Sequence, residues 1–311
     1  MEFNRKSLLE LRKWTDEELN NYYMQLRKLD YEEGKSLKGI ELRKRIHLLL
    51  LIIIKIDRLL KKEKITVLGD KSSRGNEQYI YASTHIGGND VERVFESIRK
   101  HAYLMIGDPG INYVNETGFI LTLNGYIPVQ TRDKEDRKIA YNHSVELLNK
   151  KGSLLIFPEG AYNVFENLPT MGIYPGAARM SKETGSEIIP LAIEQYDNEF
   201  VVNIGENIVP KDNMSVREMT EELRDSLSTL KWEIWESRGI SERKEFSPEF
   251  VKNFRQSIVD RDDRGDYSYT LQDIYETMYH DKSITSPEEA FAHLDNLIPS
   301  KENAFLLRKT K

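Results

Sequence analysis

From residue 65 onwards, short apolar runs alternate with longer segments in which apolar residues recur at helical spacing. The short runs predict strands at 65–68, 79–82, 103–106, 126–129, 154–157, 188–193 and 200–204, and the longer segments predict helices at 91–103, 139–149 and 177–182. This alternation predicts an α/β fold, with a mixed, mostly parallel central sheet and helices on both faces. The continuously apolar run 154–157 is typical of a strand in the interior of such a sheet.

Helical regions are predicted on either side of this α/β segment, which we place at residues 65–210. Residues 1–64 predict a helical N-terminal region, and residues 211–311 predict a helical C-terminal extension. In the extension, Ser215 and Glu218 form a capping box that opens a helix, residues 260–266 predict a loop, and another helix opens at Ser286.

The segment 41–64 has two interpretations. Its aliphatic run 48–54 lies between cations on both sides, namely Arg43, Lys44 and Arg45 before it and Lys55, Arg58, Lys61, Lys62 and Lys64 after it. The run is too short to span a bilayer, but an apolar strip edged with cations is typical of a helix lying in the headgroup region of an anionic membrane. A buried packing helix with solvated ends fits the same pattern equally well.

Composition excludes several classes of function. The 311 residues include no cysteine, which excludes a disulfide framework, thiolate catalysis and Cys-ligated zinc, and suits a reducing cytosol. A net charge of −6 and a pI near 5.7 argue against broad nucleic-acid binding. We find no membrane-spanning run, no signal-peptide pattern and no acidic or histidine cluster with metal-ligand spacing. We expect a metal-free cytoplasmic protein, peripheral on the inner face of the membrane if segment 41–64 is interfacial.

A histidine and an aspartate follow the predicted strand 79–82, in the sequence Ser83-Thr-His-Ile-Gly-Gly-Asn-Asp90. On a continuous helix, residues five apart lie about 140° from each other, but the two glycines allow a turn that brings Asp90 back to the imidazole of His85. A carboxylate on one ring nitrogen fixes the tautomer and leaves the other nitrogen free to accept a proton, as a general base requires. On spacing alone, a loop histidine followed by an ordinary Asp helix cap is the commoner arrangement.

A second carboxylate follows the predicted strand 154–157, in the sequence Phe157-Pro158-Glu159-Gly160. Open α/β sheets hold their ligands at the carboxyl ends of strands, where Glu159 is expected. Taken alone, these four residues are more often an ordinary turn.

These two segments and two others occur in the order found in the glycerolipid acyltransferase family, the lysophosphatidate (1-acylglycerol-3-phosphate) acyltransferases. Residues 125–132 (Gly-Tyr-Ile-Pro-Val-Gln-Thr-Arg) resemble the family's glycine-to-arginine block, and residues 188–193 resemble its last, proline-containing strand. Residues 175–185 are similar to the helix that precedes this strand. The resemblance covers about residues 65–210, and it is specific because four weak motifs occur in order.

In this family the histidine and the aspartate form the catalytic dyad, which implies that His85 is a general base and that Asp90 orients it. The resemblance also implies that Arg132, or the neighbouring Arg137, holds a phosphate of the acceptor. It implies further that the next motif helps to bind the acceptor, and this motif consists of Phe157, Pro158, Glu159 and Gly160.

The chain departs from the family pattern at three places. Thr84 replaces the usual Asn before the histidine, and Arg132 lies one position later than usual. Ala161 and Tyr162 replace the usual Thr-Arg after Glu-Gly, which removes a guanidinium suited to bidentate phosphate binding. The acceptor is therefore left open: its phosphate meets Arg132, Arg137 or Arg179, or it carries no phosphate there.

The resemblance implies an O-acyltransferase of phospholipid biosynthesis. It would move a fatty acyl group from acyl-CoA or acyl carrier protein to a hydroxyl of a lysophospholipid or glycerol-phosphate-type acceptor, with no cofactor besides this co-substrate. Backbone N–H groups near residues 87–90 are expected to stabilise the oxyanion. The alternative is a catalytically silent lipid-binding or membrane-surface scaffold, which the altered residues 161 and 162 favour and the intact His85–Asp90 pair opposes. Acyl-chain length, donor carrier, oligomeric state and the role of residues 241–311 stay open.

Overall fold

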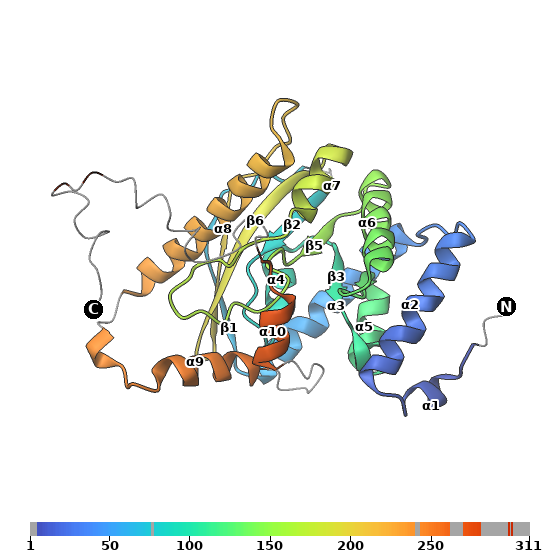
Figure 1. The fold of residues 1–311 in the computed structure, drawn as a ribbon, viewed down its shortest axis with the longest axis horizontal. Helices are drawn as coiled ribbons and strands as arrows, with labels where there is room; N and C mark the ends of the chain where they lie inside the picture. Colours follow the sequence, from blue (N-terminus) through green and yellow to red (C-terminus); the bar gives the residue numbers. More distant parts are fainter. Residues whose placement is uncertain are drawn as a thin grey trace. The chain divides into compact units, whose positions relative to one another are not determined.

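The computed structural model describes residues 5–75, 78–239, 243–261, 270–280, 298 and 300. Its centre is a seven-stranded sheet with the strand order β1-β7-β6-β2-β5-β3-β4 (Figure 1). The strands are β1 (Lys64–Asp70), β2 (Tyr79–Ser83), β3 (Tyr103–Gly107), β4 (Tyr126–Val129), β5 (Leu154–Ile156), β6 (Glu187–Tyr196) and β7 (Glu199–Ile204). Neighbouring strands from β6 to β4 are parallel, whereas β7 runs antiparallel to β6 and parallel to β1. The predicted mixed, mostly parallel sheet is confirmed.

Helices cover both faces of this sheet, as predicted. In β2, Ile80 and Ala82 belong to the core formed with α6, α7 and α8, whereas Tyr79 and Tyr81 belong to the core formed with α4. Because successive side chains of a strand point to opposite faces of the sheet, β2 contributes residues to two cores, one on each face. The helices are α1 (Leu8–Leu11), α2 (Asp16–Glu32), α3 (Ile40–Leu60), α4 (Asp90–Ile98), α5 (Glu116–Asn124), α6 (Lys134–Asn149), α7 (Gly176–Thr184), α8 (Val216–Arg238), α9 (Phe250–Val259) and α10 (Leu271–Thr277).

Two predicted helices differ from the structure by several residues at one end. The predicted helix 91–103 is too long, because Arg99 adopts a left-handed backbone conformation (φ 51°) that ends α4 at Ile98. The helix predicted at 139–149 begins earlier, since the side chain of Asp133 accepts a hydrogen bond from the N–H of Asp136 and caps α6.

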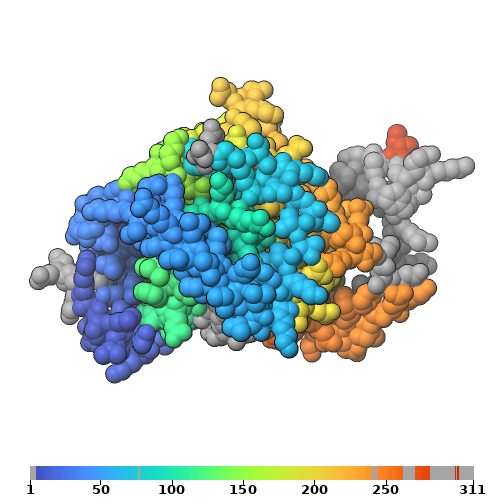
Figure 2. Space-filling model, turned by 180° about the vertical axis from the view of Figure 1, so that it is seen from behind, coloured from blue at the N-terminus to red at the C-terminus, as the bar shows by residue number. Residues whose placement is uncertain are grey.

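Helix α3 contains most of the segment 41–64 and has two unlike faces. Ile40, His47 and Leu50 are buried, and Leu51 and Ile54 pack against the core that contains α4. The opposite face carries aliphatic side chains that are each more than half exposed, namely Leu42, Leu48, Leu49, Ile52, Ile53, Ile56, Leu59 and Leu60. Figure 2 shows α3 in blue, crossing the back of the molecule. The buried face shows that α3 packs against the rest of the fold, and an interfacial role for its exposed face stays a prediction. Among the described helices, none combines the length and the apolar character that a membrane span requires.

The C-terminal helices belong to the same compact unit as the sheet, which extends to Met278. Leu223 and Leu227 of α8 are buried in the core that contains α6 and α7, and α8 opens with the predicted capping box. The division into residues 1–64, 65–210 and 211–311 stays a prediction. Most of the predicted loop 260–266, and the helix predicted at Ser286, lie outside the described residues.

Candidate active site

The predicted site residues lie at one edge of the sheet, where the parallel strands end. His85 follows β2, Glu159 follows β5, and Arg132 follows β4. Neighbouring strands are about 4.8 Å apart, and β2 pairs with β5, so His85 and Glu159 meet directly. Strand β4 is three strands from β2, about 14 Å away, so Arg132 begins well to one side of His85.

His85 and Asp90 are in direct contact. The Nδ1 atom of His85 lies 2.7 Å from Oδ2 of Asp90, and the same oxygen accepts hydrogen bonds from the N–H groups of Ile86 (2.7 Å) and Gly87 (3.0 Å). Positive φ angles at Gly87 (79°) and Gly88 (63°) form the turn that brings Asp90 back to the ring. Since the carboxylate accepts the Nδ1 proton, Nε2 is the nitrogen left to act as a base. The predicted contact is present.

Aromatic side chains fix the plane of the His85 ring. Phe157 stacks on it with a centroid distance of 4.0 Å and an interplanar angle of 23°, and Tyr162 meets it edge-on at 4.5 Å and 78°. The His85 side chain is 17% exposed, so part of it stays accessible to solvent or a substrate. Thr84, which replaces the usual Asn, is buried, and its Oγ1 accepts a hydrogen bond from the N–H of Ile193 at 3.0 Å.

Glu159 is fully buried beneath the histidine loop. Its Oε1 accepts a hydrogen bond from the N–H of His85 at 3.3 Å, and its Oε2 accepts one from the N–H of Met171 at 2.9 Å. Burial raises the pKa of Glu159 to about 7. The carboxylate therefore links two loops and has no exposed oxygen, and the role of its motif in acceptor binding stays a prediction. Gly160 is exposed, and Pro158 is buried.

The predicted phosphate-binding arginines do not converge on His85. The side chain of Arg132 is 67% exposed and pairs with Glu276 of α10, at 2.6 Å between Nη2 and Oε2. Arg137 donates through Nη1 to the carbonyl oxygen of Thr131. Arg179 is exposed on α7. Of these three cations in the described part of the chain, Arg132 forms an ion pair with a distant helix, α10.

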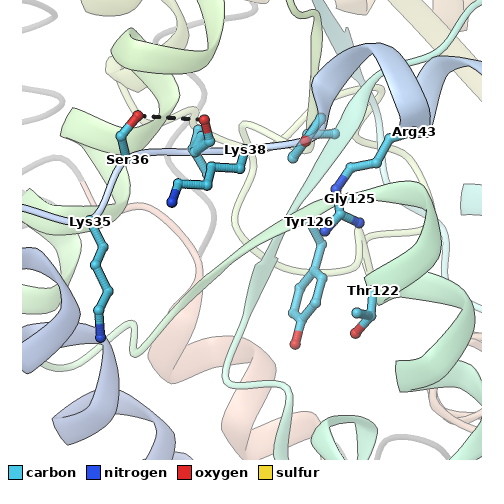
Figure 3. A pocket seen from close by; sticks show the side chains of 9 residues that line it. Lys35, Ser36, Lys38, Arg43, Thr122, Gly125 and Tyr126 are labelled. Atoms are coloured by element: carbon cyan, nitrogen blue, oxygen red, sulfur yellow. Dashed lines mark hydrogen bonds between the residues drawn. The ribbon is translucent and has the colours of Figure 1, made fainter.

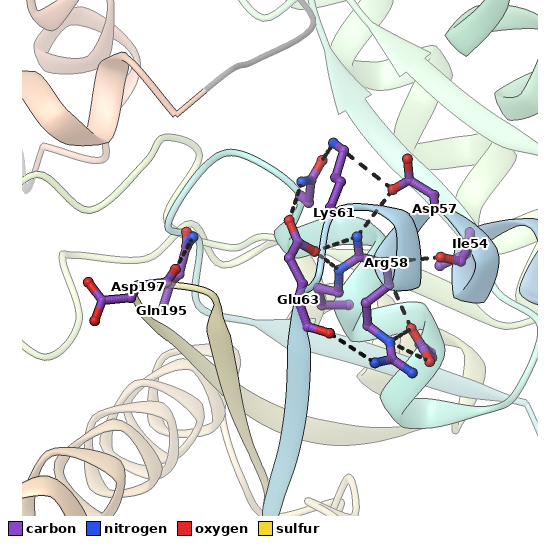
Figure 4. A network of polar contacts seen from close by, with 10 residues as sticks. Ile54, Asp57, Arg58, Lys61, Glu63, Gln195 and Asp197 are labelled. Carbon is purple, nitrogen blue, oxygen red and sulfur yellow. Dashed lines mark hydrogen bonds and ion pairs between the residues drawn. The ribbon is translucent and has the colours of Figure 1, made fainter.

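A buried ionic network, which sequence analysis missed, holds the helix that carries Asp90 (Figure 4). Arg93 lies one turn further along α4 and is fully buried. Its Nε donates to Oε2 of Glu63 at 2.7 Å, and its Nη2 lies 3.2 Å from Oδ2 of Asp57. Asn89, directly before Asp90, donates to the other oxygen of Glu63 at 2.9 Å. The end of α3 is thereby tied to the start of the catalytic helix. No sequence pattern distinguishes these charges from solvated ones.

Comparison with known sequences assigns this part of the chain to a family. The family model described as Acyltransferase matches residues 64–194. Residues 64–194 are an acyltransferase-family domain. The acyltransferase domain includes the His85–Asp90 turn and the Glu159 loop, and the resemblance to the glycerolipid acyltransferases is confirmed.

Two named proteins are similar to the chain. A 1-acyl-sn-glycerol-3-phosphate acyltransferase of Borreliella burgdorferi is 28% identical over 158 residues, which cover 49% of this chain and 59% of that protein. The match thus spans about three fifths of that relative's length. The crystal structure of the 1-acyl-sn-glycerophosphate acyltransferase PlsC from Thermotoga maritima matches with a TM-score of 0.53 at 12% identity, covering 76% of this chain and 98% of that one. At this identity the match concerns the fold, and the acyltransferase domain has the α/β architecture of PlsC.

Proposed function

We propose that this protein is an O-acyltransferase of phospholipid biosynthesis that uses His85 as its general base. The observation that carries the proposal is the 2.7 Å contact of His85 with Asp90, placed within an acyltransferase domain at the carboxyl edge of the sheet. This contact leaves one ring nitrogen to accept a proton, and the fully buried Asp90 carboxylate stabilises the imidazolium that results.

The proposed reaction needs no covalent enzyme intermediate. Nε2 of His85 takes the proton of the acceptor hydroxyl as that oxygen attacks the carbonyl carbon of a thioester. The carbon–sulfur bond then breaks, and the imidazolium returns the proton to the leaving thiolate. General base catalysis of this kind contributes roughly 100- to 10,000-fold to the rate.

Only some backbone N–H groups of the turn between His85 and Asp90 are available to stabilise an oxyanion. The N–H groups of Ile86 and Gly87 both donate to Asp90 and are not free for a substrate. Within the described part of the chain we find no acceptor for the N–H groups of Gly88 and Asn89, and we assign the oxyanion to these two. They stand at the start of α4, where the helix dipole favours negative charge.

The proposed substrates are a thioester donor, acyl-CoA or acyl carrier protein, and a lysophospholipid or glycerol-phosphate-type acceptor. The names of the B. burgdorferi and T. maritima relatives support this class of acceptor. Arg132 lies at the same sheet edge as His85 and, with Arg137 beside it, is the proposed ligand of the acceptor phosphate.

We also propose that α3 contacts an anionic membrane surface from which the lipid substrates come. The eight exposed aliphatic side chains of α3 are the apolar half of an interfacial helix, and the exposed cations Arg45, Lys55 and Lys62 lie among or beside them. A pocket of about 360 Å³ at the start of α3 adds positive charge (Figure 3). Its lining includes Lys38 and Arg43, which suit anionic lipid headgroups, whereas the third cation, Lys35, is already paired with Asp30 and Glu33.

A donor-by-acceptor activity screen with mass-spectrometric detection of products tests the enzymatic proposal. We expect the purified protein to transfer an acyl group from at least one thioester to a lysophospholipid. Lipid binding without any thioester consumption would instead identify the protein as a silent scaffold.

Vesicle co-sedimentation tests the membrane proposal separately. The variant Ile53→Gln/Ile56→Gln should lose binding to vesicles that contain phosphatidylglycerol. The control Val209→Gln/Trp232→Gln changes two apolar side chains of similar exposure outside α3 and should bind like the wild type. Equal binding by both variants would remove α3 as the membrane contact.

A further inference from the structure

The C-terminal helices pack onto the loop that carries the altered family motif. Ala161, directly after Glu159-Gly160, shares a buried cluster with Ile258 of α9 and Ile274 of α10. Tyr162, which touches the His85 ring, packs against the same cluster. Since α9 and α10 lie outside the family-matched residues 64–194, this cover is an addition to the acyltransferase domain.

The end of α9 also reaches the catalytic turn itself. A methyl group added at Gly88 would lie 3.2 Å from the carbonyl oxygen and 3.3 Å from Cβ of Arg261. One added at Gly87 would lie 3.4 Å from the carbonyl oxygen of Ile258. Gly88 therefore serves a second purpose besides the turn, because its lack of a side chain lets the C-terminal segment approach the loop between His85 and Asp90.

This approach places the guanidinium of Arg261 beside the dyad. Its Nη1 donates to the carbonyl oxygen of Ile86 at 3.1 Å, and burial lowers the pKa of Arg261. The nearby carboxylates of Asp90 and Glu194 act against this effect of burial, but neither pairs directly with Arg261: Oδ2 of Asp90 binds His85, and Glu194 binds Lys231 at 2.9 Å. Among the described residues, no carboxylate forms an ion pair with Arg261. A partly buried guanidinium that forms no ion pair within the described residues has N–H donors left to bind an anionic ligand.

We propose that Arg261 binds a phosphate group of a substrate at the acyl-transfer site, and so determines the preference for phosphorylated substrates. A guanidinium suits this role because its planar fork matches phosphate oxygens. Position 162, where the family usually has an arginine, supplies no cation to this loop. The phosphate belongs either to the acceptor or to the carrier of the donor. The inference rests on the proposed acyltransferase function.

A two-by-two substrate comparison tests this role and separates the two sources of phosphate. Acceptors with and without phosphate (lysophosphatidate and monoacylglycerol) are combined with donors with and without phosphate (acyl-CoA and an acyl N-acetylcysteamine thioester). Arg261→Ala should lower kcat/KM by about tenfold to a hundredfold for pairs that contain the recognised phosphate, and leave the other pairs unchanged. Arg261→Lys should restore part of the loss. Arg224→Ala, which removes an exposed arginine paired with its neighbour Asp225, is the matched control.

Two results would overturn the inference. An equal loss on all four pairs would mean that Arg261 only supports the fold of the loop, and no loss on any pair would mean that it does not meet the substrate. Calorimetric binding of glycerol 3-phosphate and of CoA to the wild type and to Arg261→Ala requires no turnover. A wild type that is inactive on every pair but binds one of these ligands through Arg261 would refute the proposed reaction and retain the phosphate site.

Discussion

Replacing Asp90 by Asn tests the dyad with little change in shape. Oδ2 of Asp90 accepts the Nδ1 proton of His85 and the N–H groups of Ile86 and Gly87. An asparagine whose amide oxygen takes this position keeps an acceptor for all three donors. The turn should therefore persist, with a loss of about 1–2 kcal/mol in the free energy of unfolding, because the bonds now end on a neutral acceptor.

The charge of Asp90 matters most when His85 is protonated, which happens as the acceptor hydroxyl attacks. Two opposite unit charges about 4 Å apart interact by about 4 kcal/mol at an effective dielectric constant of about 20. Loss of this term from the transition state corresponds to about a thousandfold in rate. Water near the exposed part of the ring weakens this charge–charge interaction. We therefore expect Asp90→Asn to lower kcat about a hundredfold to a thousandfold, with little change in the acceptor KM.

The assay is release of free thiol from acyl-CoA in the presence of the best acceptor from the screen. Asp90→Ala serves as a comparison, since it leaves three donors without their acceptor and should lose more stability than Asp90→Asn at a similar loss of kcat. If Asp90→Asn keeps more than a third of the wild-type kcat while folding normally, Asp90 does not stabilise an imidazolium at His85.

Three further changes test other parts of the structure. Burial raises the pKa of Glu159 from its ordinary 4.5 to about 7, so the native state binds an extra proton between these two pH values. The free energy of unfolding of the wild type should therefore fall as the pH rises from about 4.5 to about 7. Urea titrations should show this fall for the wild type but not for Glu159→Gln. Arg93→Met leaves the carboxylate of Glu63 without its buried partner and should lower the free energy of unfolding by about 3–5 kcal/mol, and a loss below about 1 kcal/mol in the same titrations would contradict the network. Glu276→Gln frees Arg132 from an exposed pair, and should lower the KM of a phosphorylated acceptor by at most about fivefold, an effect that Arg132→Ala should abolish.

The fold and the dyad are predictable from sequence because both depend on local patterns. Apolar runs at strand length, such as 154–157, define the sheet, and side chains just after such runs fall at its carboxyl edge. Two glycines between His85 and Asp90 permit one tight turn, and Asp90 is the first residue of the helix that follows. The contact between them spans five positions, so no distant part of the chain decides it.

The rest of the site depends on contacts between residues far apart in sequence. Arg261 meets Ile86 across 175 positions, and no periodicity or motif encodes that contact. The N–H of Met171, twelve positions away, donates to the second oxygen of Glu159, and no motif at residue 159 encodes that contact. The two faces of α3 could not be separated either, because a mostly aliphatic helix does not itself indicate which side packs against the sheet.

The most direct test of the proposed function is the rate of acyl transfer by His85→Ala relative to the wild type. The measurement uses the best donor–acceptor pair, and both acylated product and free thiol are quantified. We predict a fall of roughly 100- to 10,000-fold in kcat with the fold retained, because the proton acceptor is lost while Glu159 still binds the backbone N–H at position 85. Undiminished transfer by His85→Ala would contradict the proposed mechanism.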